Sequence, residues 1–93
     1  MIRSFRCKET RRIYEGHASK RFAAYQRVIE RKLQMLADAT TLDDLRSTPG
    51  NRLEELDRDR KGQHSIRVND QFRICFRWTP DGPEDIEFVD YHR

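Results

Sequence analysis

The spacing of hydrophobic side chains changes midway along the chain, from the three- and four-residue steps of a helix to the alternation of strands. Ser19 stands where a helix N-cap belongs, and an apolar stripe follows it. The stripe comprises Phe22, Tyr25, Ile29, Leu33 and Leu36, and the opposite face comprises Lys20, Arg27, Arg31 and Gln34. This pattern predicts an amphipathic helix of about five turns.

Shorter elements flank this helix. Residues 2–6 are a strand candidate, and residues 8–15 can form a short helix that Gly16 would end. Residues 41–44 read Thr-Leu-Asp-Asp, a capping box that opens a further helical turn. Residues 48–51 read Thr-Pro-Gly-Asn, which predicts a turn.

Strict alternation between residues 64 and 78 predicts two strands joined by a hairpin. Apolar side chains alternate with polar or basic ones in HSIRV and again in FRICFRW. Asn69 and Asp70 are expected to form a two-residue turn between these strands. Residues 79–83 predict a second turn, and residues 86–91 predict the last strand.

The order of these elements predicts the fold class. Residues 52–56 add a weaker strand candidate, in which Leu53 is better placed for burial than Leu56. Helices then come first and strands last, which is typical of an α+β protein. We expect two N-terminal helices packed on one face of a small, mostly antiparallel sheet, in a single domain of residues 1–93.

Charge is distributed unevenly along the chain. Charged residues make up 38% and hydrophobic residues 35%, which predicts a thin core beneath a highly charged surface. Residues 1–37 carry a net charge of +7 and residues 38–93 a net charge of −4, within a total of +3. The basic residues are 15 arginines and 4 lysines. Because arginine suits bidentate phosphate contact, this bias favours RNA or an acidic partner, although genome composition produces the same bias.

Neither the cysteines nor the histidines predict a metal site. Cys7 and Cys75 are isolated, without a CxxC motif, and we expect reduced thiols. His17, His64 and His92 are scattered, without metal-ligand spacing. The opening of the chain has no apolar leader and no stretch approaches the length of a membrane span, so we expect a cytoplasmic protein without membrane contact.

The alternation also predicts which side chains share a face. The expected core side of the last two strands consists of Phe72, Ile74, Phe76, Trp78, Ile86 and Phe88. The open side consists of Arg73, Cys75, Arg77, Glu87, Val89 and Tyr91. His92 falls on the other side unless the strand bends, so Arg73 is joined more securely to Tyr91. A solvated sheet surface has the same pattern, so periodicity alone leaves catalytic and structural interpretations open.

Five segments together resemble HigB-type toxins of the RelE/ParE superfamily. They read IRSF (residues 2–5), RVIERKLQMLADAT (27–40), PGNRLEEL (49–56), GQHSIRVNDQFRICF (62–76) and VDYH (89–92). The resemblance spans essentially the whole chain, and the third and fourth segments are the most specific to the HigB branch.

The resemblance implies a fold, an activity and partners. Such toxins have two N-terminal helices on a small sheet, enter the ribosomal A site and cut the mRNA there. The message's own 2′-hydroxyl is the nucleophile, so neither a metal nor another cofactor is needed. A HigA-like antitoxin with a helix-turn-helix silences the toxin, and only the complex of the two binds operator DNA.

The resemblance also implies site residues. Arg73 would stabilise charge on the scissile phosphate, and Tyr91 and His92 would transfer protons to and from the reacting oxygens. Histidine carries protons easily near neutral pH, whereas Tyr91 lies on the better face, so the base is left open between them. Basic residues expected to contact RNA are Lys20, Arg21, Arg27, Arg31, Arg58, Arg60, Lys61, Arg67 and Arg77.

One segment departs from the family pattern. Some relatives read LHPLKG where this chain reads LEELD, so Glu54 and Asp57 replace a histidine and a lysine. These two carboxylates are auxiliary site candidates, because a carboxylate can act as a base but also repels phosphate. A slower nuclease therefore follows as one interpretation. The alternatives are a ParE-like inhibitor of a protein such as DNA gyrase, or a weakened toxin that mainly binds antitoxin.

Overall fold

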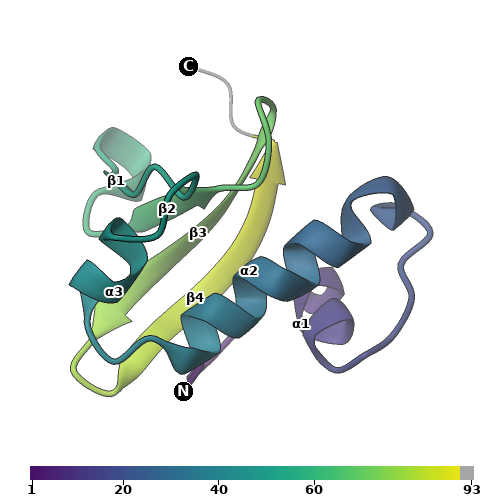
Figure 1. The fold of residues 1–93 in the computed structure, drawn as a ribbon, viewed down its shortest axis with the longest axis horizontal. Helices are drawn as coiled ribbons and strands as arrows, with labels where there is room; N and C mark the ends of the chain where they lie inside the picture. The colour runs from purple at the N-terminus through teal and green to yellow at the C-terminus, as the bar shows by residue number, and fades with distance from the viewer. Residues whose placement is uncertain (91–93) are drawn as a thin grey trace.

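The computed structural model describes residues 1–90, which fold into helices packed against one antiparallel sheet (Figure 1). The helices are α1 (Lys8–Tyr14), α2 (Gln26–Asp38) and α3 (Leu42–Arg46), with 3-10 turns at Ala23–Tyr25 and Arg58–Arg60. The strands are β1 (Glu54–Glu55), β2 (His64–Arg67), β3 (Phe72–Thr79) and β4 (Gly82–Asp90), in the spatial order β1-β2-β3-β4. The predicted α+β class is confirmed.

The core lies between α2 and the sheet. Figure 1 shows α2 running across one face of the strands, and its Ile29, Leu33 and Leu36 have no exposed surface. Ile74 and Phe76 of β3 are equally buried against this helix layer. The apolar side of β3 therefore faces the helices as predicted, and the intervening side chains of β3 face away from them.

The predicted five-turn helix is wrong at its start, because α2 begins only at Gln26. The side chain of Gln26 accepts a hydrogen bond from the Ser19 backbone N–H at 2.9 Å and donates to the His17 carbonyl at 3.0 Å. The Ser19 hydroxyl accepts from the Phe22 backbone N–H at 3.1 Å. Ser19 therefore closes a separate turn before α2, and these polar contacts take the place of a first helical turn.

The short N-terminal helix and the capping box are confirmed. Helix α1 ends just before Gly16, whose φ of 96° suits glycine. At α3 the Thr41 side chain accepts from the Asp44 backbone N–H at 3.3 Å, and the Asp44 carboxylate accepts from the Thr41 backbone N–H at 3.1 Å. This reciprocal pair fixes where α3 begins.

The N-terminal strand candidate forms only one isolated bridge, in which Phe5 runs parallel to Ile86. The cause is a bulge in β4, where Asp85 has a φ of 53° and the register with β3 shifts. The Ser4 hydroxyl accepts a hydrogen bond from the Asp85 backbone N–H at 2.9 Å. Residues 2–6 thus follow the edge of β4 without building a regular ladder with it.

The two hairpins differ from their predicted lengths. The β2–β3 connection spans Asn69 to Gln71 rather than two residues, because the Asn69 carboxamide accepts from the Gln71 and Phe72 backbone N–H groups at 2.8 Å each. Strand β4 starts at Gly82, four residues before the predicted start. Ile86 and Phe88 of β4 face the core as predicted, with 0% and 5% exposure.

Strand β1 is short and reverses one burial prediction. Only Glu54 and Glu55 pair with β2. Leu56 is buried, with 5% exposure, whereas Leu53 is half-buried. The Leu56 backbone N–H donates to the Gln63 carbonyl at 2.9 Å, which draws the start of the following loop against the sheet.

Candidate functional site

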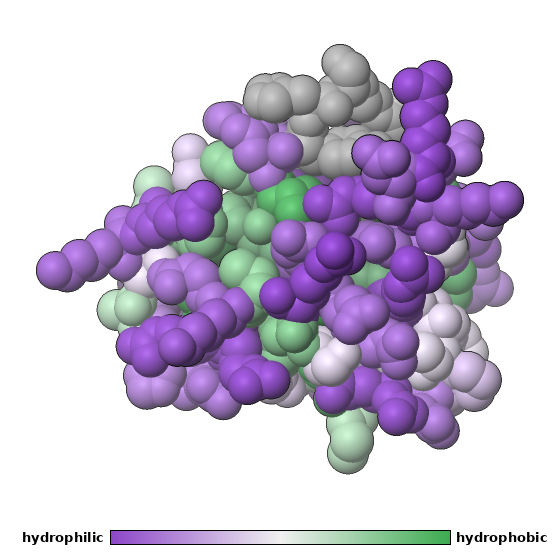
Figure 2. All heavy atoms as spheres, turned by 180° about the vertical axis from the view of Figure 1, so that it is seen from behind, coloured by the Kyte–Doolittle hydropathy of each residue, from purple (hydrophilic) through white to green (hydrophobic). Residues whose placement is uncertain are grey.

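The site candidates lie on the sheet face opposite α2. Two rows of side chains cross this face in the register of the strands. One row consists of Glu54, Ser65, Cys75 and Glu87, and the next consists of Arg67, Arg73 and Val89. Figure 2, which views the molecule from behind, shows a mainly hydrophilic surface with a small apolar strip near its centre.

Arg73 is held in place by neutral groups of its own chain. Its Nε donates to the Ser65 hydroxyl at 2.6 Å, and its Nη2 donates to the Ser65 carbonyl at 3.2 Å and to the Arg52 carbonyl. Arg73 is 8% exposed, so the expectation of an exposed strand arginine is wrong. Alternation gave the correct face, but the turn that supplies Arg52 lies 21 positions earlier and covers this side chain.

Glu54 stands beside the same guanidinium. Its Oε1 lies 3.9 Å from Nη1 of Arg73, at the limit of an ion pair. The Glu54 side chain is 29% exposed and that of Arg73 10% exposed, so the pair lies at the edge between interior and solvent. A carboxylate here neutralises part of the charge that a phosphate would meet.

The loop of residues 57–62 covers the other end of this face. Nη1 of Arg60 donates to Glu87 Oε1 at 3.1 Å and to Gln63 Oε1 at 3.2 Å. Cys75 beneath them has no exposed surface, so its predicted place on an open surface is wrong. Burial raises the pKa of the Cys75 thiol, while the charges of Arg60, Glu87 and Arg73 add smaller, opposing effects.

The basic residues predicted to contact RNA fall into two groups on different sides of the molecule. Those of the helix layer are exposed and comprise Lys20, Arg21, Arg27 and Arg31. Those near Arg73 comprise Arg58, Arg60, Lys61, Arg67 and Arg77. Three of the second group face carboxylates of the chain, since Arg60 pairs with Glu87, Arg67 with Asp70 and Arg77 with Asp85. The second auxiliary candidate, Asp57, is exposed, and its carboxylate accepts a hydrogen bond from the Arg58 backbone N–H at 2.8 Å.

The chain was compared with known families after this geometry had been defined. A family of RelE-like toxins, described as HigB of type II toxin-antitoxin systems, matches residues 3–92. The chain belongs to the HigB family of toxins. Toxin HigB-1 of Vibrio cholerae is 37% identical over 95 residues, which cover 100% of this chain and 99% of that protein.

Two further relatives widen the comparison. An uncharacterised protein of Haemophilus influenzae is 40% identical over 66 residues, which cover 71% of this chain and 64% of that protein. The solved YoeB–YefM complex from Staphylococcus aureus matches with a TM-score of 0.61 and 16% identity, covering 100% of this chain and 99% of the matched chain. At that identity the likeness establishes the fold of this HigB-family toxin, which is the RelE-like fold predicted from the sequence.

Tyr91 and His92 lie outside the described residues, so their roles stay predictions. Strand β4 ends at Asp90, the residue before Tyr91, and Val89 pairs with Arg73 across the sheet. The described end of β4 is therefore next to the Arg73 row. Beside it, a hollow of about 270 Å³ on the helix side is lined by Arg21, Phe22, Tyr25, Phe72, Phe88 and Asp90.

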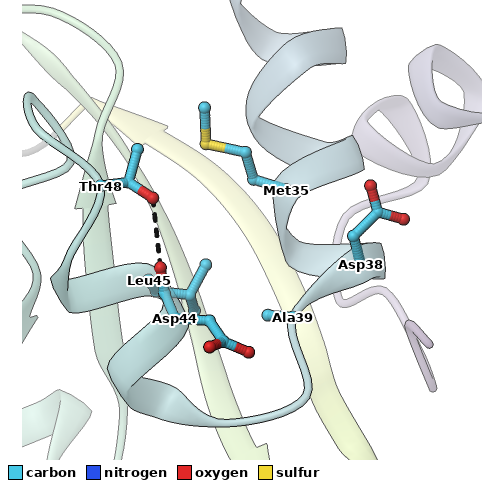
Figure 3. A pocket seen from close by; sticks show the side chains of 6 residues that line it. All are labelled: Met35, Asp38, Ala39, Asp44, Leu45 and Thr48. Carbon is cyan, nitrogen blue, oxygen red and sulfur yellow. Dashed lines mark hydrogen bonds between the residues drawn. The ribbon is translucent and has the colours of Figure 1, made fainter.

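A second hollow, of about 230 Å³, separates α2 from α3 (Figure 3). Met35, Asp38 and Ala39 line it from the α2 side, and Asp44, Leu45 and Thr48 from the α3 side. Hydrogen bonds from Thr40 and Thr41 lower the pKa of Asp44, whose carboxylate is engaged in capping α3. This hollow is a seam between helices and carries none of the predicted site residues.

Sequence reasoning missed the residues that hold Arg73. Ser65 was assigned only to a strand and Arg52 only to a weak strand candidate, yet both supply its hydrogen-bond acceptors. The available signal was the Pro-Gly-Asn turn, which predicts a bent backbone just before Arg52 but not the direction of its carbonyl. Across residues 1–90, the structure contains no group of three His, Cys, Asp or Glu side chains suited to a metal and no helix able to cross a membrane.

Proposed function

We propose that this HigB-family toxin is a metal-independent endoribonuclease that cuts mRNA in the ribosomal A site. The observation that carries the proposal is the register of β3 and β4, which places Arg73 opposite Val89, two positions before Tyr91. A fixed cation next to the strand end that leads into a tyrosine and a histidine suits metal-free cleavage of a phosphodiester.

Each residue would have a separate role in this reaction. The guanidinium of Arg73, oriented by Ser65, would stabilise the charge that develops on the phosphorus-bound oxygens. Tyr91 or His92 would remove the proton from the 2′-hydroxyl, and the other would protonate the leaving 5′-oxygen. Attack by the 2′-hydroxyl would leave a cyclic phosphate on the upstream fragment, so no activated water and no cofactor is needed.

We also propose the partners. A HigA-like antitoxin with a helix-turn-helix would neutralise the toxin, and only the complex would bind operator DNA. Membership of a type II toxin-antitoxin family supports an antitoxin partner. The S. aureus protein of the same fold was solved as a complex of YoeB with YefM, which supports the same proposal.

The position of Glu54 favours a slow nuclease within this proposal. Arg73 is mostly buried and faces a carboxylate at 3.9 Å, so a phosphate has to compete with that carboxylate for the guanidinium. A toxin of low turnover that is held mainly by its antitoxin remains the second candidate on this observation. The candidates differ in whether purified protein cuts messages at all.

Toeprinting of mRNA on programmed ribosomes tests the proposal. Purified toxin is expected to produce a cut inside the A-site codon, and Arg73→Gln is expected to abolish it. The matched control is Arg46→Gln, because Arg46 is an exposed arginine on α3 that pairs only with Asp43. Intact message with wild-type toxin would refute nuclease activity, and inhibition of gyrase by the same preparation would support the ParE-like alternative.

A further inference from the structure

Asn51, in the Pro-Gly-Asn turn, ties three elements together. It is completely buried, and its side-chain Nδ2 donates to the Leu45 carbonyl of α3 at 3.1 Å. Its Oδ1 accepts a hydrogen bond from Nζ of Lys32 on α2. Its own carbonyl accepts from the Arg67 backbone N–H of β2 at 2.7 Å. Asn51 is thus fixed from α2, α3 and β2 at once.

The next residue carries this restraint to the candidate site. Arg52 adopts a φ of 44°, in the left-handed region that costs energy for a side-chain-bearing residue. In this conformation its carbonyl accepts a hydrogen bond from Nη2 of Arg73. A continuous path of contacts therefore runs from Lys32 through Asn51 and Arg52 to the Arg73 guanidinium.

We infer that Lys32 and Asn51 are positioning residues for Arg73, which hold the Arg52 carbonyl where it orients the guanidinium. The consequence for RNA cleavage rests on the proposed function, whereas the coupling to Arg73 does not. Neither residue touches the reacting atoms in this arrangement. Both act through the backbone of residues 51 and 52.

The chemistry of Lys32 is unusual for a residue that only fastens helices. It is 7% exposed, and burial, with smaller contributions from Arg31 and Arg67, lowers the pKa of its amine. An apolar pair of similar volume would join α2 to the turn without the cost of desolvating a charge. A hydrogen-bonded pair instead fixes the direction of the Asn51 side chain, and hence the path of the backbone that follows it.

The test replaces the polar pair by an apolar one. In the Lys32→Met/Asn51→Leu variant, no buried acceptor or amine of the pair is left unmatched, so the fold has the best prospect of surviving. The matched control is Thr10→Val, which removes another buried hydrogen bond, the one its hydroxyl accepts from the Phe88 N–H at 3.2 Å. If the double variant does not fold, Lys32→Met alone serves, because it keeps the Asn51 contact to α3.

Two readouts separate positioning from a purely structural role. The first is the ¹⁵N–¹H signal of Arg73 Nε, assigned by its loss in Arg73→Lys, which should shift and exchange faster with solvent in the double variant. The second is ribosome-dependent cleavage, in which kcat should fall about 10- to 100-fold while KM stays within about twofold, because misplacement of a catalytic group by about 1 Å costs that much. Thr10→Val should change neither readout.

The outcomes distinguish the inference from the function on which it rests. A folded double variant with an unchanged Arg73 signal and unchanged kcat would overturn the inference. A shifted Arg73 signal in a protein whose wild type cuts no RNA would refute the proposed nuclease and still support the coupling. A shifted signal together with a fall in kcat would support both.

Discussion

The carboxylate of Glu54 lies 3.9 Å from the guanidinium of Arg73, across the edge of the sheet where β1 meets β2. Because β1 contains only two residues, Glu54 is one of just two of its side chains paired with β2. Glu54 therefore has a dual character. It is the counter-ion of a mostly buried arginine, and it competes with any phosphate that approaches.

Removing this negative charge should speed cleavage. The Glu54→His/Asp57→Lys variant takes away two carboxylates and should increase cleavage rate and toxicity. Repulsion of about 1 kcal/mol per nearby charge corresponds to roughly fivefold in rate. Single-turnover cleavage on programmed ribosomes measures the change, and Glu54→Gln should give a smaller increase alone. A complete loss of cleavage in Glu54→Gln would show instead that this carboxylate is the general base.

Truncating Arg73 should destabilise the protein as well as inactivate it. Arg73→Ala leaves the Ser65 and Arg52 acceptors and the Glu54 charge without this donor, so the free energy of unfolding should fall by about 2–4 kcal/mol. Urea denaturation provides the measurement. The control is Arg77→Ala, whose side chain is 41% exposed and which should cost less than about 1 kcal/mol. Equal losses in the two variants would contradict the observed set of contacts.

The alternation of β3 predicted the direction of its side chains but not what covers them. Ile74 and Phe76 face the helices because an alternating strand beside a helix layer has only one apolar side. Arg73 and Cys75 do lie on the opposite face, yet both are buried. Their covering comes from loops distant in sequence, and hydrophobic periodicity contains no information about such contacts.

The start of α2 was mispredicted for a local reason. The spacing of Phe22 and Tyr25 fits a helix, but it fits a turn followed by a 3-10 segment equally well. The deciding contacts are the hydrogen bonds of Gln26 to the backbone of Ser19 and His17. A glutamine at such a position is not recognisable as a turn-closing residue from one sequence.

The two cysteines should differ sharply in reactivity. Cys75 is fully buried and burial raises its thiol pKa, so little thiolate forms and reagents cannot reach it. Cys7 is only half-buried. Titration of the native toxin with a coloured disulfide reagent should therefore show one thiol reacting readily and the second only after unfolding. Two thiols that react at equal rates in the native protein would contradict the burial of Cys75.

The two basic groups should respond differently to the size of the RNA target. Neutralising Arg58 and Lys61 should weaken binding of a short RNA and reduce its salt dependence, by a slope of about 0.7 per lost phosphate contact. Neutralising Arg27 and Arg31 should matter only on ribosomes, because α2 lies on the face away from Arg73 and can reach ribosomal RNA alone. Filter binding over a salt series tests both variants. An equal effect of both on the short RNA would contradict this division.

Lys32 should make stability depend on alkaline pH. Its pKa is lower in the folded protein than the ordinary value of 10.5. Between these two values the unfolded chain binds more protons, so the free energy of unfolding rises with pH and levels off above 10.5. Lys32→Met removes this contribution, and the wild type should gain stability relative to the variant as pH rises toward 10.5. Parallel urea midpoints of the two proteins over that range would contradict the burial of a charged amine.

The segment beside β4 has a consequence for how the toxin behaves at high concentration. Arg3 and Arg6 donate backbone hydrogen bonds to the Pro83 and Ile86 carbonyls at 2.8 and 2.9 Å, and the hydroxyl of Thr10 accepts from the Phe88 N–H. The opposite border of the sheet is β1, only two residues long. Within residues 1–90, neither border therefore offers a long unpaired strand on which a second chain could grow. Such a toxin can accumulate without forming fibrils, and a binding partner has to recognise its side chains rather than extend its sheet.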